Sequence, residues 1–250
     1  MRRIPTDTPL WTYVLLAINL LIFVLMEASG GTLRASTLVR FGANYAPLVA
    51  NGEVFRLVTA NFIHIGVMHF LLNALSLYNI GPLTESLFGK PRFIMLYLLS
   101  GISGATLSYF LTHGLSAGAS TALAGMTGAL FVYFFRHRNE MRDVARQYMI
   151  RILMIVAINV AYGLSPGSGV DNWGHLGGLL GGAALGWFFC PRYEVSQHAF
   201  GVVNPRKPRH EPELDNGSLM DTNTIAGNWL TVLIFVAVIA ALVFLRGRIG

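Results

Sequence analysis

Charged residues and cysteine are both scarce in this sequence. Asp, Glu, Lys and Arg make up 12% of the 250 residues, whereas soluble domains typically contain about 25%. Hydrophobic residues account for 54%. The single cysteine, Cys190, excludes an internal disulfide. A composition this poor in charge argues against an ordinary soluble domain and indicates that much of the chain lies in lipid.

Charged residues are also scarce in seven long apolar stretches, five of which contain none. A helix needs about 20 apolar residues to cross a hydrocarbon core about 30 Å thick. We therefore predict an all-α polytopic membrane protein with spans near residues 10–28, 62–83, 93–113, 119–135, 150–165, 173–190 and 229–245. The first stretch is too long for the apolar part of a signal peptide and ends without a small-residue cleavage site, so we expect it to remain as an anchor.

The distribution of basic residues predicts an orientation. The formal net charge of +6 could suggest nucleic acid, but the Lys and Arg residues form no single patch with interleaved aromatics, so no nucleic-acid partner is expected. With the N-terminus in the cytoplasm, thirteen of the 18 Lys and Arg residues are cytoplasmic and five lie outside. This split follows the positive-inside rule and places the C-terminus outside. Without an Arg-rich, Ser-rich transit peptide, a bacterial inner membrane is the simplest location.

The spans fall into two groups separated by a linker. Residues 191–224 contain prolines, Asn216-Gly217 and mixed charges, which are typical of a cytoplasmic linker. We therefore predict a six-helix core over residues 1–190 and a seventh transmembrane helix with the C-terminus over residues 225–250. The last span is almost free of polar residues, so we assign it anchoring and no chemistry.

Polar side chains inside spans need a reason, because a charge there costs about 2.5 kcal/mol or more on insertion scales. In the second span, His69 and Asn73 are four residues apart and share one helical face. His64, five residues before His69, is expected to point elsewhere. The pair His69 and Asn73 is thus a candidate polar site.

The sixth span combines a histidine with small residues. At about 100° per residue, one stripe contains His175, Gly178, Gly182 and Gly186. Small residues allow two helices to approach closely in lipid. The fourth span offers a matching face of small residues: Ser120, Ala124 and Thr127. We therefore expect His175 to face a close neighbour.

Ser120 and His175 both lie at the beginning of a span that enters from the outside, so they are expected at similar depth. A serine hydroxyl needs a base within hydrogen-bond reach to attack a peptide bond, and a neutral imidazole can serve. Ser120 and His175 could form this dyad, with His69 and Asn73 as donors to the oxyanion. His113 is a rival base only through its closeness in sequence.

The remaining histidines and the metal motifs indicate no further chemistry. Three histidines fall in segments expected to be cytoplasmic and solvated: His137, His198 and His210. The spacing of His64 and His69, without an acidic neighbour, is not the zinc-protease pattern. No metal and no cofactor are expected.

The ordered set of motifs resembles the rhomboid family of intramembrane serine proteases over roughly residues 42–190. The likeness comprises Phe55-Arg56, where the family usually has Trp-Arg, then His64-x4-His69-x3-Asn73, Tyr97-Leu98-Leu99-Ser100-Gly101-x-x-Gly104, Gly118-Ala119-Ser120 and His175-x-x-Gly178-x-x-x-Gly182. The last span is similar to the seventh helix of the six-plus-one arrangement found in part of the family. The set as a whole is far more specific than any one motif.

The resemblance implies roles for these residues. Ser120 would be the nucleophile and His175 the general base and then acid, with no third acidic member. His69, Asn73 and the Ser120 backbone N–H would stabilise the oxyanion, while Gly178, Gly182 and Ala124 pack near the site. The implied substrates are transmembrane proteins, often single-pass, cut near the outer face of the bilayer.

Two residues depart from the family pattern. Thr121 follows Ser120 where the family usually has Gly, and it adds bulk beside the nucleophile. Ala124 stands where the family usually has an aromatic residue that stacks on the catalytic His. These departures bear on rate and substrate range more than on the type of reaction.

Two other functions are alternatives. A catalytically impaired rhomboid-like protein that binds transmembrane helices would be expected to lack Ser120 or His175, and both are present. A proton-coupled transporter using the intramembrane histidines would usually carry intramembrane carboxylates as well. Here Glu27 and Glu85 lie near span ends, and no repeat symmetry is apparent.

Overall fold

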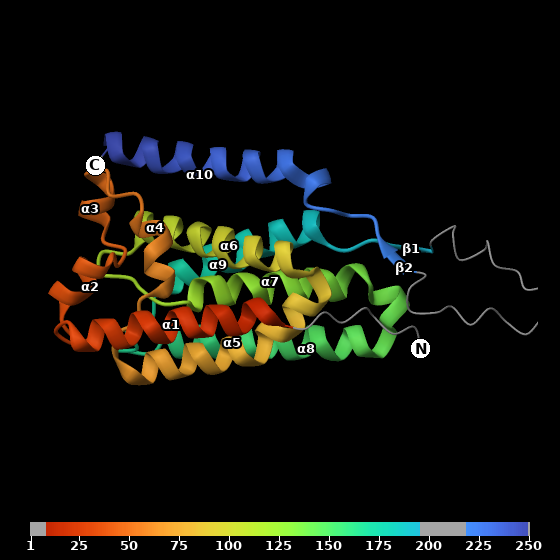
Figure 1. Cartoon of the computed structure of the whole chain (residues 1–250), viewed down its shortest axis with the longest axis horizontal. Coiled ribbons are helices and arrows are strands. Elements are labelled where there is room, and N and C mark those ends of the chain that lie inside the picture. Colours follow the sequence, from red (N-terminus) through yellow and green to blue (C-terminus); the bar gives the residue numbers. More distant parts are fainter. Residues whose placement is uncertain (1–8, 196–218, 250) are drawn as a thin grey trace, which may run out of the picture.

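The computed structural model of the chain describes residues 9–195 and 219–249. Each predicted span forms a long helix in this part of the chain (Figure 1), with these bounds: α1 Leu10–Ala28, α5 Gly66–Phe88, α6 Lys90–Leu111, α7 Ser120–Arg136, α8 Arg138–Gly163, α9 Asn172–Phe189 and α10 Trp229–Ile249. The all-α polytopic membrane fold is confirmed.

The long helices differ in how clearly their composition suits a membrane. Among the described helices, α1, α6, α8 and α10 are long and apolar enough to span one, and α5 becomes a fifth if it is joined to residues 56–62, which are bent from it by 89°. By contrast, α7 and α9 have 17 and 18 residues, and α9 contains six glycines. These two helices contain Ser120 and His175, and their crossing of the bilayer stays a prediction.

Two predicted boundaries are wrong by several residues. The second span begins at Gly66 and not near residue 62, because a short 3-10 segment, η1 (Ala60–Phe62), precedes it and Gly66 adopts a φ of +76°. The fifth begins at Arg138, well before residue 150, because its polar first half is also helical. Hydropathy finds the apolar part of a helix and not its full length.

A buried carboxylate joins the first two long helices. Glu85 near the end of α5 accepts hydrogen bonds from the backbone N–H groups of Trp11 (2.9 Å) and Thr12 (2.8 Å), and from the Thr12 hydroxyl (2.9 Å). The first N–H groups of a helix have no partner within it, and Pro9 supplies no side-chain cap to α1. Glu85 fills that role from the neighbouring helix.

The segment between α1 and α5 forms a compact cap over one end of the bundle (Figure 1). It contains three short helices, α2 (Ala35–Phe41), α3 (Ala46–Ala50) and α4 (Arg56–Thr59). The buried Arg56 guanidinium donates to the carbonyls of Val39 (2.8 Å) and Ala43 (3.1 Å) and pairs with Glu53. Two reciprocal backbone hydrogen bonds join Asn44 to Ser116, which lies just before α7. This cap marks the site end of the molecule, where α7 and α9 begin.

The helices α6, α7 and α9 form the tightly packed centre. A methyl group added at Gly182 of α9 would lie 2.0 Å from the Gly125 carbonyl oxygen of α7, and one at Gly178 would lie 2.1 Å from the Thr121 carbonyl oxygen. One at Gly104 of α6 would lie 2.5 Å from the Gly174 carbonyl oxygen of α9. The glycine stripe of the sixth span therefore does face the fourth span, as expected.

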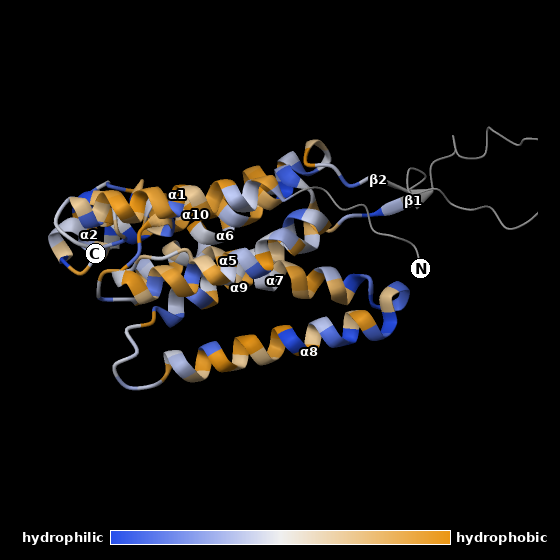
Figure 2. Cartoon of the chain, turned by 60° about the horizontal axis from the view of Figure 1, so that its bottom comes forward, coloured by the Kyte–Doolittle hydropathy of each residue, from blue (hydrophilic) through white to orange (hydrophobic). Residues whose placement is uncertain are grey.

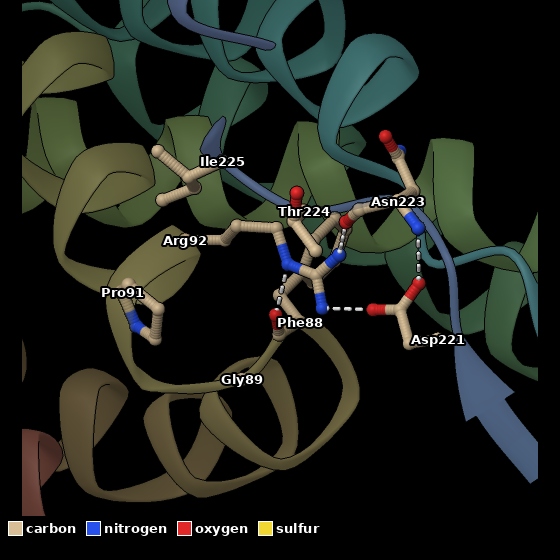
Figure 3. Close-up of a pocket in the computed structure, with 8 residues that line it drawn as sticks. All are labelled: Phe88, Gly89, Pro91, Arg92, Asp221, Asn223, Thr224 and Ile225. Atoms are coloured by element: carbon tan, nitrogen blue, oxygen red, sulfur yellow. Dashed lines mark hydrogen bonds and ion pairs between the residues drawn. The ribbon is translucent and has the colours of Figure 1, made fainter. Parts of the chain in front are cut away.

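At the opposite end, the linker is fastened to the core. Two short antiparallel strands, β1 (Tyr193–Val195) and β2 (Leu219–Asp221), interrupt what was expected to be an irregular segment. Figure 3 shows Arg92 between the Phe88 and Asn223 carbonyls and the Asp221 carboxylate, all of which it contacts. A 3-10 segment, η3 (Ala226–Asn228), then leads into α10, whose sides are largely exposed.

The helix α8 lies at the edge of the bundle (Figure 2). Its first half is more hydrophilic and its second half more hydrophobic. Only Ala145, Ile152 and Gly163 are buried along it, and its regular helix is broken at Arg142, with a φ of 42°.

Candidate active site

Ser120 is the first residue of α7, and this helix start has no side-chain cap. Free N–H groups and the helix dipole make such a terminus favourable for negative charge. The half-buried Ser120 side chain and its backbone N–H thus sit at a position suited to a developing oxyanion.

Gly118 brings His69 next to the serine. Its φ of +134° suits glycine, and a methyl group there would lie 2.7 Å from both Cε1 and Nε2 of His69 and 3.4 Å from Ser120 Oγ. The His69 ring edge and the serine hydroxyl therefore flank one glycine. The Gly-Ala-Ser motif needs glycine here for space as well as for its backbone conformation.

A backbone hydrogen bond assigns the tautomer of His69. The Ile65 N–H donates to His69 Nδ1 at 3.3 Å, so Nδ1 is an acceptor. In a neutral imidazole the proton then resides on Nε2, which makes Nε2 a donor. Since Nε2 is the atom next to Gly118, this donor lies on the Ser120 side of the ring.

Asn73 is buried one turn further along α5. One N–H of its side-chain amide donates to the His69 carbonyl oxygen at 2.9 Å. An amide carries two N–H groups, so the second is available to another acceptor. The shared face predicted for His69 and Asn73 is present.

His175 lies in the first turn of α9, which is fixed by a residue that the sequence did not reveal. Asp171 caps this helix by accepting from the Gly174 N–H at 2.9 Å. Its carboxylate also accepts from the hydroxyls of Thr112 (2.8 Å) and Ser116 (2.5 Å) in the loop before Ser120. Asp171 thereby connects the His175 helix to the serine loop, and an Asp directly before a helix was the available signal.

The packing of α7 against α9 brings the regions of Ser120 and His175 together. A methyl group at Gly174 would lie 3.0 Å from Thr121 Cγ2, so the residue before His175 meets the residue after Ser120. No hydrogen bond joins the Ser120 and His175 side chains in the described chain, and such bonds often tighten only when substrate binds.

The two departures from the family pattern have different surroundings. The Thr121 hydroxyl donates to Oδ1 of the buried Asn61 at 2.6 Å. At Ala124, no aromatic ring takes the expected place, and no ring pair within the described ranges includes His175. His175 is held through its helix, whose start is fixed by Asp171.

His64 was expected to point away from His69, and this expectation was wrong. His64 precedes α5, is 1% exposed, and its ring centroid lies 5.5 Å from those of both His69 and Phe70. The chain turns sharply before Gly66, so helical spacing from His69 does not apply.

Two other histidines of the described chain lie between helices. His113 is exposed on the loop after α6. His137 is half-buried, contrary to its expected solvation, because its ring packs 4.4 Å from that of Tyr133. His198 and His210 lie outside the described residues. No cluster of three or more His, Cys, Asp or Glu side chains suited to a metal occurs in residues 9–195 and 219–249.

These features define the class: a polytopic helical membrane protein with serine and histidine at the starts of two closely packed helices. A sequence model of the Rhomboid domain matches residues 51–192. The chain belongs to the rhomboid family, as its motifs predicted.

Relatives of the chain occur in bacteria and eukaryotes. It is 40% identical over 182 residues to Rhomboid protease GluP of Bacillus subtilis (strain 168), covering 71% of this chain and 35% of that protein. It is 32% identical over 219 residues to RHOMBOID-like protein 7 of Arabidopsis thaliana, covering 85% and 63%. Rhomboid-like protease 3 of Toxoplasma gondii is 35% identical over 172 residues, covering 67% and 64%. The chain thus spans about a third to two thirds of these relatives' length.

Proposed function

We propose that this protein is an intramembrane serine endopeptidase with a Ser120–His175 dyad. The observation that carries the proposal is the close approach at Gly118, which puts His69 Nε2 and Ser120 Oγ beside one another at a helix start. Nucleophile and oxyanion donors would then surround the same point. Names of relatives, among them Rhomboid protease GluP, support the same reaction class.

In the proposed reaction, His175 accepts the hydroxyl proton as Ser120 Oγ attacks the scissile carbonyl carbon. The resulting oxyanion accepts hydrogen bonds from His69 Nε2, Asn73 and the Ser120 N–H. His175 then gives its proton to the departing amine nitrogen as the C–N bond breaks. Water, deprotonated by His175, hydrolyses the acyl-enzyme, releasing the carboxylate product and restoring Ser120.

The proposed substrates are transmembrane proteins cut near the outer membrane face. The candidate site lies at the beginnings of α7 and α9, which the distribution of Lys and Arg assigns to the outside, with the N-terminus in the cytoplasm and the C-terminus outside. A carbonyl already bonded within a helix is poorly presented for attack, so the substrate helix must unwind locally. We place the protein in a bacterial inner membrane, and the proposed reaction needs no cofactor.

A catalytically impaired, helix-binding protein is the alternative, and one observation favours it. In the described chain His175 has no aromatic partner and no hydrogen bond to Ser120. A loosely held base would lower the rate of attack.

Cleavage of a single-pass reporter by the purified full-length protein in liposomes tests the proposal. Wild type should cut, whereas Ser120→Ala and His175→Ala should fall to background while unfolding at the wild-type temperature. Ser76→Ala, which changes an exposed serine of α5 whose hydroxyl donates to the Leu72 carbonyl of its own helix at 2.8 Å, is the matched control and should retain substantial cleavage. Cutting that survives Ser120→Ala would exclude this nucleophile, and reporter binding without cutting by wild type would favour the alternative.

A further inference from the structure

The position of Ser120 is fixed by hydrogen bonds on both sides of it. The Gly118 N–H donates to the Ala60 carbonyl oxygen at 2.9 Å, and the Thr121 hydroxyl donates to Asn61 Oδ1 at 2.6 Å. The two donors bracket the serine, and the two acceptors are consecutive residues of η1. The start of α7 has no side-chain cap, and these two bonds attach the residues around Ser120 to η1.

Asn61 is itself held in one orientation. Its side-chain N–H groups donate to the carbonyl oxygens of Leu57 (2.9 Å) and Val58 (3.2 Å), which leaves Oδ1 to face Thr121. The residue is 2% exposed, so water does not compete for these bonds. A buried amide with defined donors is a rigid acceptor.

The motif Tyr97-x-x-x-Gly101-x-x-Gly104 of α6 surrounds this arrangement. The Tyr97 hydroxyl donates to the Asn61 carbonyl oxygen at 3.3 Å. A methyl group at Gly101 would lie 2.4 Å from Asn61 Oδ1, and one at Gly104 would lie 2.8 Å from Thr121 Cβ. Both glycines therefore make room for the Asn61–Thr121 pair, a purpose that the sequence did not suggest.

The same segment leads to the oxyanion histidine. Three residues after η1 comes Ile65, whose N–H donates to His69 Nδ1. Residues 60–65 thus hold Ser120 at one end and the His69 ring at the other. A shift between η1 and α7 would change the distance from the nucleophile to the oxyanion donor.

We infer that Thr121 and Asn61 are positioning residues that set the placement of Ser120 relative to His69. The inference rests on the proposed function of Ser120 as nucleophile. Glycine, which the family usually has after the serine, has no hydroxyl and could not form this bond, so the bond depends on a residue that departs from the family pattern.

The decisive comparison is Thr121→Val against Thr127→Val. Both replace a hydroxyl by a methyl on α7, but the Thr127 hydroxyl bonds only the Leu123 carbonyl of its own helix, at 2.8 Å. Misplacement of reacting groups by about 1 Å can cost about 100-fold in rate. We expect Thr121→Val to lower kcat by about 10- to 100-fold with KM within about twofold of wild type, and Thr127→Val to leave both unchanged.

Two further measurements separate positioning from general structure. The rate at which a fluorophosphonate probe labels Ser120 should fall in Thr121→Val and return in Thr121→Ser, which keeps the hydroxyl. Asn61→Leu should lower kcat similarly, and the double variant should be no worse than either single one, since partners in one interaction are non-additive. If Thr121→Val does not fold, Thr121→Ala replaces it. Thr121→Ala should then lower kcat and the labelling rate, and Thr121→Ser should not.

Failure of the inference and failure of the proposed function give different results. If wild type cleaves the reporter but Thr121→Val matches Thr127→Val, or if its loss lies entirely in KM, the positioning role is excluded. If wild type neither cleaves nor becomes labelled while folded, the nucleophile assignment fails and the inference fails with it.

Discussion

The two neighbours α8 and α9 pack against α7 in opposite ways. On the α9 side, glycines press against backbone: a methyl group at Gly186 would lie 2.7 Å from the Ala129 Cα atom. On the α8 side few residues are buried, and Ile158 is 67% exposed. One face of α7 thus packs with its backbone in contact with α9. The other face meets α8, a helix whose surface is mostly exposed to lipid.

The difference matches the distribution of the candidate site residues. Ser120 lies on α7 and His175 on α9, whereas α8 supplies none of the four candidates. The rigid contact lies between the two helices that contain the proposed nucleophile and the proposed base. The loosely packed helix contains neither.

The largest expected effect comes from wedging α7 and α9 apart. Gly182→Leu places side-chain atoms where the Gly125 carbonyl oxygen would be 2.0 Å from the first of them. Backbone cannot rotate away as a side chain can, so we expect destabilisation by about 3 kcal/mol or loss of the folded protein, with cleavage at background. Ala184→Leu, on the exposed side of the same helix, should unfold like wild type in detergent. Equal unfolding temperatures would contradict the close contact.

A core truncation on α9 and a similar one on α8 should differ by several kcal/mol. Leu185 is 1% exposed, so Leu185→Ala should cost about 2–5 kcal/mol through lost contacts and a cavity. Ile158→Ala on α8 should cost less than about 1 kcal/mol, because the side chain meets lipid. Denaturant titration in micelles measures both. A larger loss from Ile158→Ala would mean that α8 is packed as tightly as α9.

Removing the cap of α9 should have an intermediate effect. Asp171→Ala removes the carboxylate that accepts three hydrogen bonds and leaves the Thr112 and Ser116 hydroxyls without this partner. We expect a loss of about 1–3 kcal/mol and a fall in cleavage, since the first turn containing His175 loosens. Asp143→Ala, at an exposed position of α8, is the control for loss of one carboxylate. Unchanged stability and cleavage in Asp171→Ala would show that α9 needs no cap.

The smallest expected effect concerns the break in α8. Arg142 has a φ of 42°, which is strained for a residue with a side chain, so Arg142→Gly should stabilise the protein by about 0.5–1 kcal/mol. Arg146→Gly in the regular part of the helix should instead destabilise it by about 1 kcal/mol. Thermal unfolding of the two variants compares them directly. If both destabilise equally, the break at Arg142 is not a real feature of α8.

The sequence was sufficient to predict the long helices and which residues share a face of one helix. Apolar length located every long helix, and the spacing of Gly178 and Gly182 identified the face of α9 that meets α7. The shared face of His69 and Asn73 followed from the helical repeat. These predictions succeeded because each depends on residues a few positions apart in one helix.

The rest depends on contacts between distant residues. The Thr121–Asn61 bond joins residues 60 positions apart, and Thr112 lies 59 positions from its partner Asp171. No spacing rule connects them, so Thr121 appeared only as an unexplained departure. His64 was misplaced for a related reason, because the helical rule was applied across a turn that only the fold reveals.

The bond between Glu85 and the start of α1 has a consequence for how the chain assembles. A ribosome releases residues 10–28 long before residue 85, yet the two first-turn N–H groups of α1 have their protein acceptor 73 and 74 residues later. Until residue 85 has been synthesised, these two N–H groups of α1 therefore lack their acceptor from the protein. Synthesis of α5 supplies Glu85 as the acceptor. Residues 10–88 are therefore the earliest stretch in which the start of α1 has its partner.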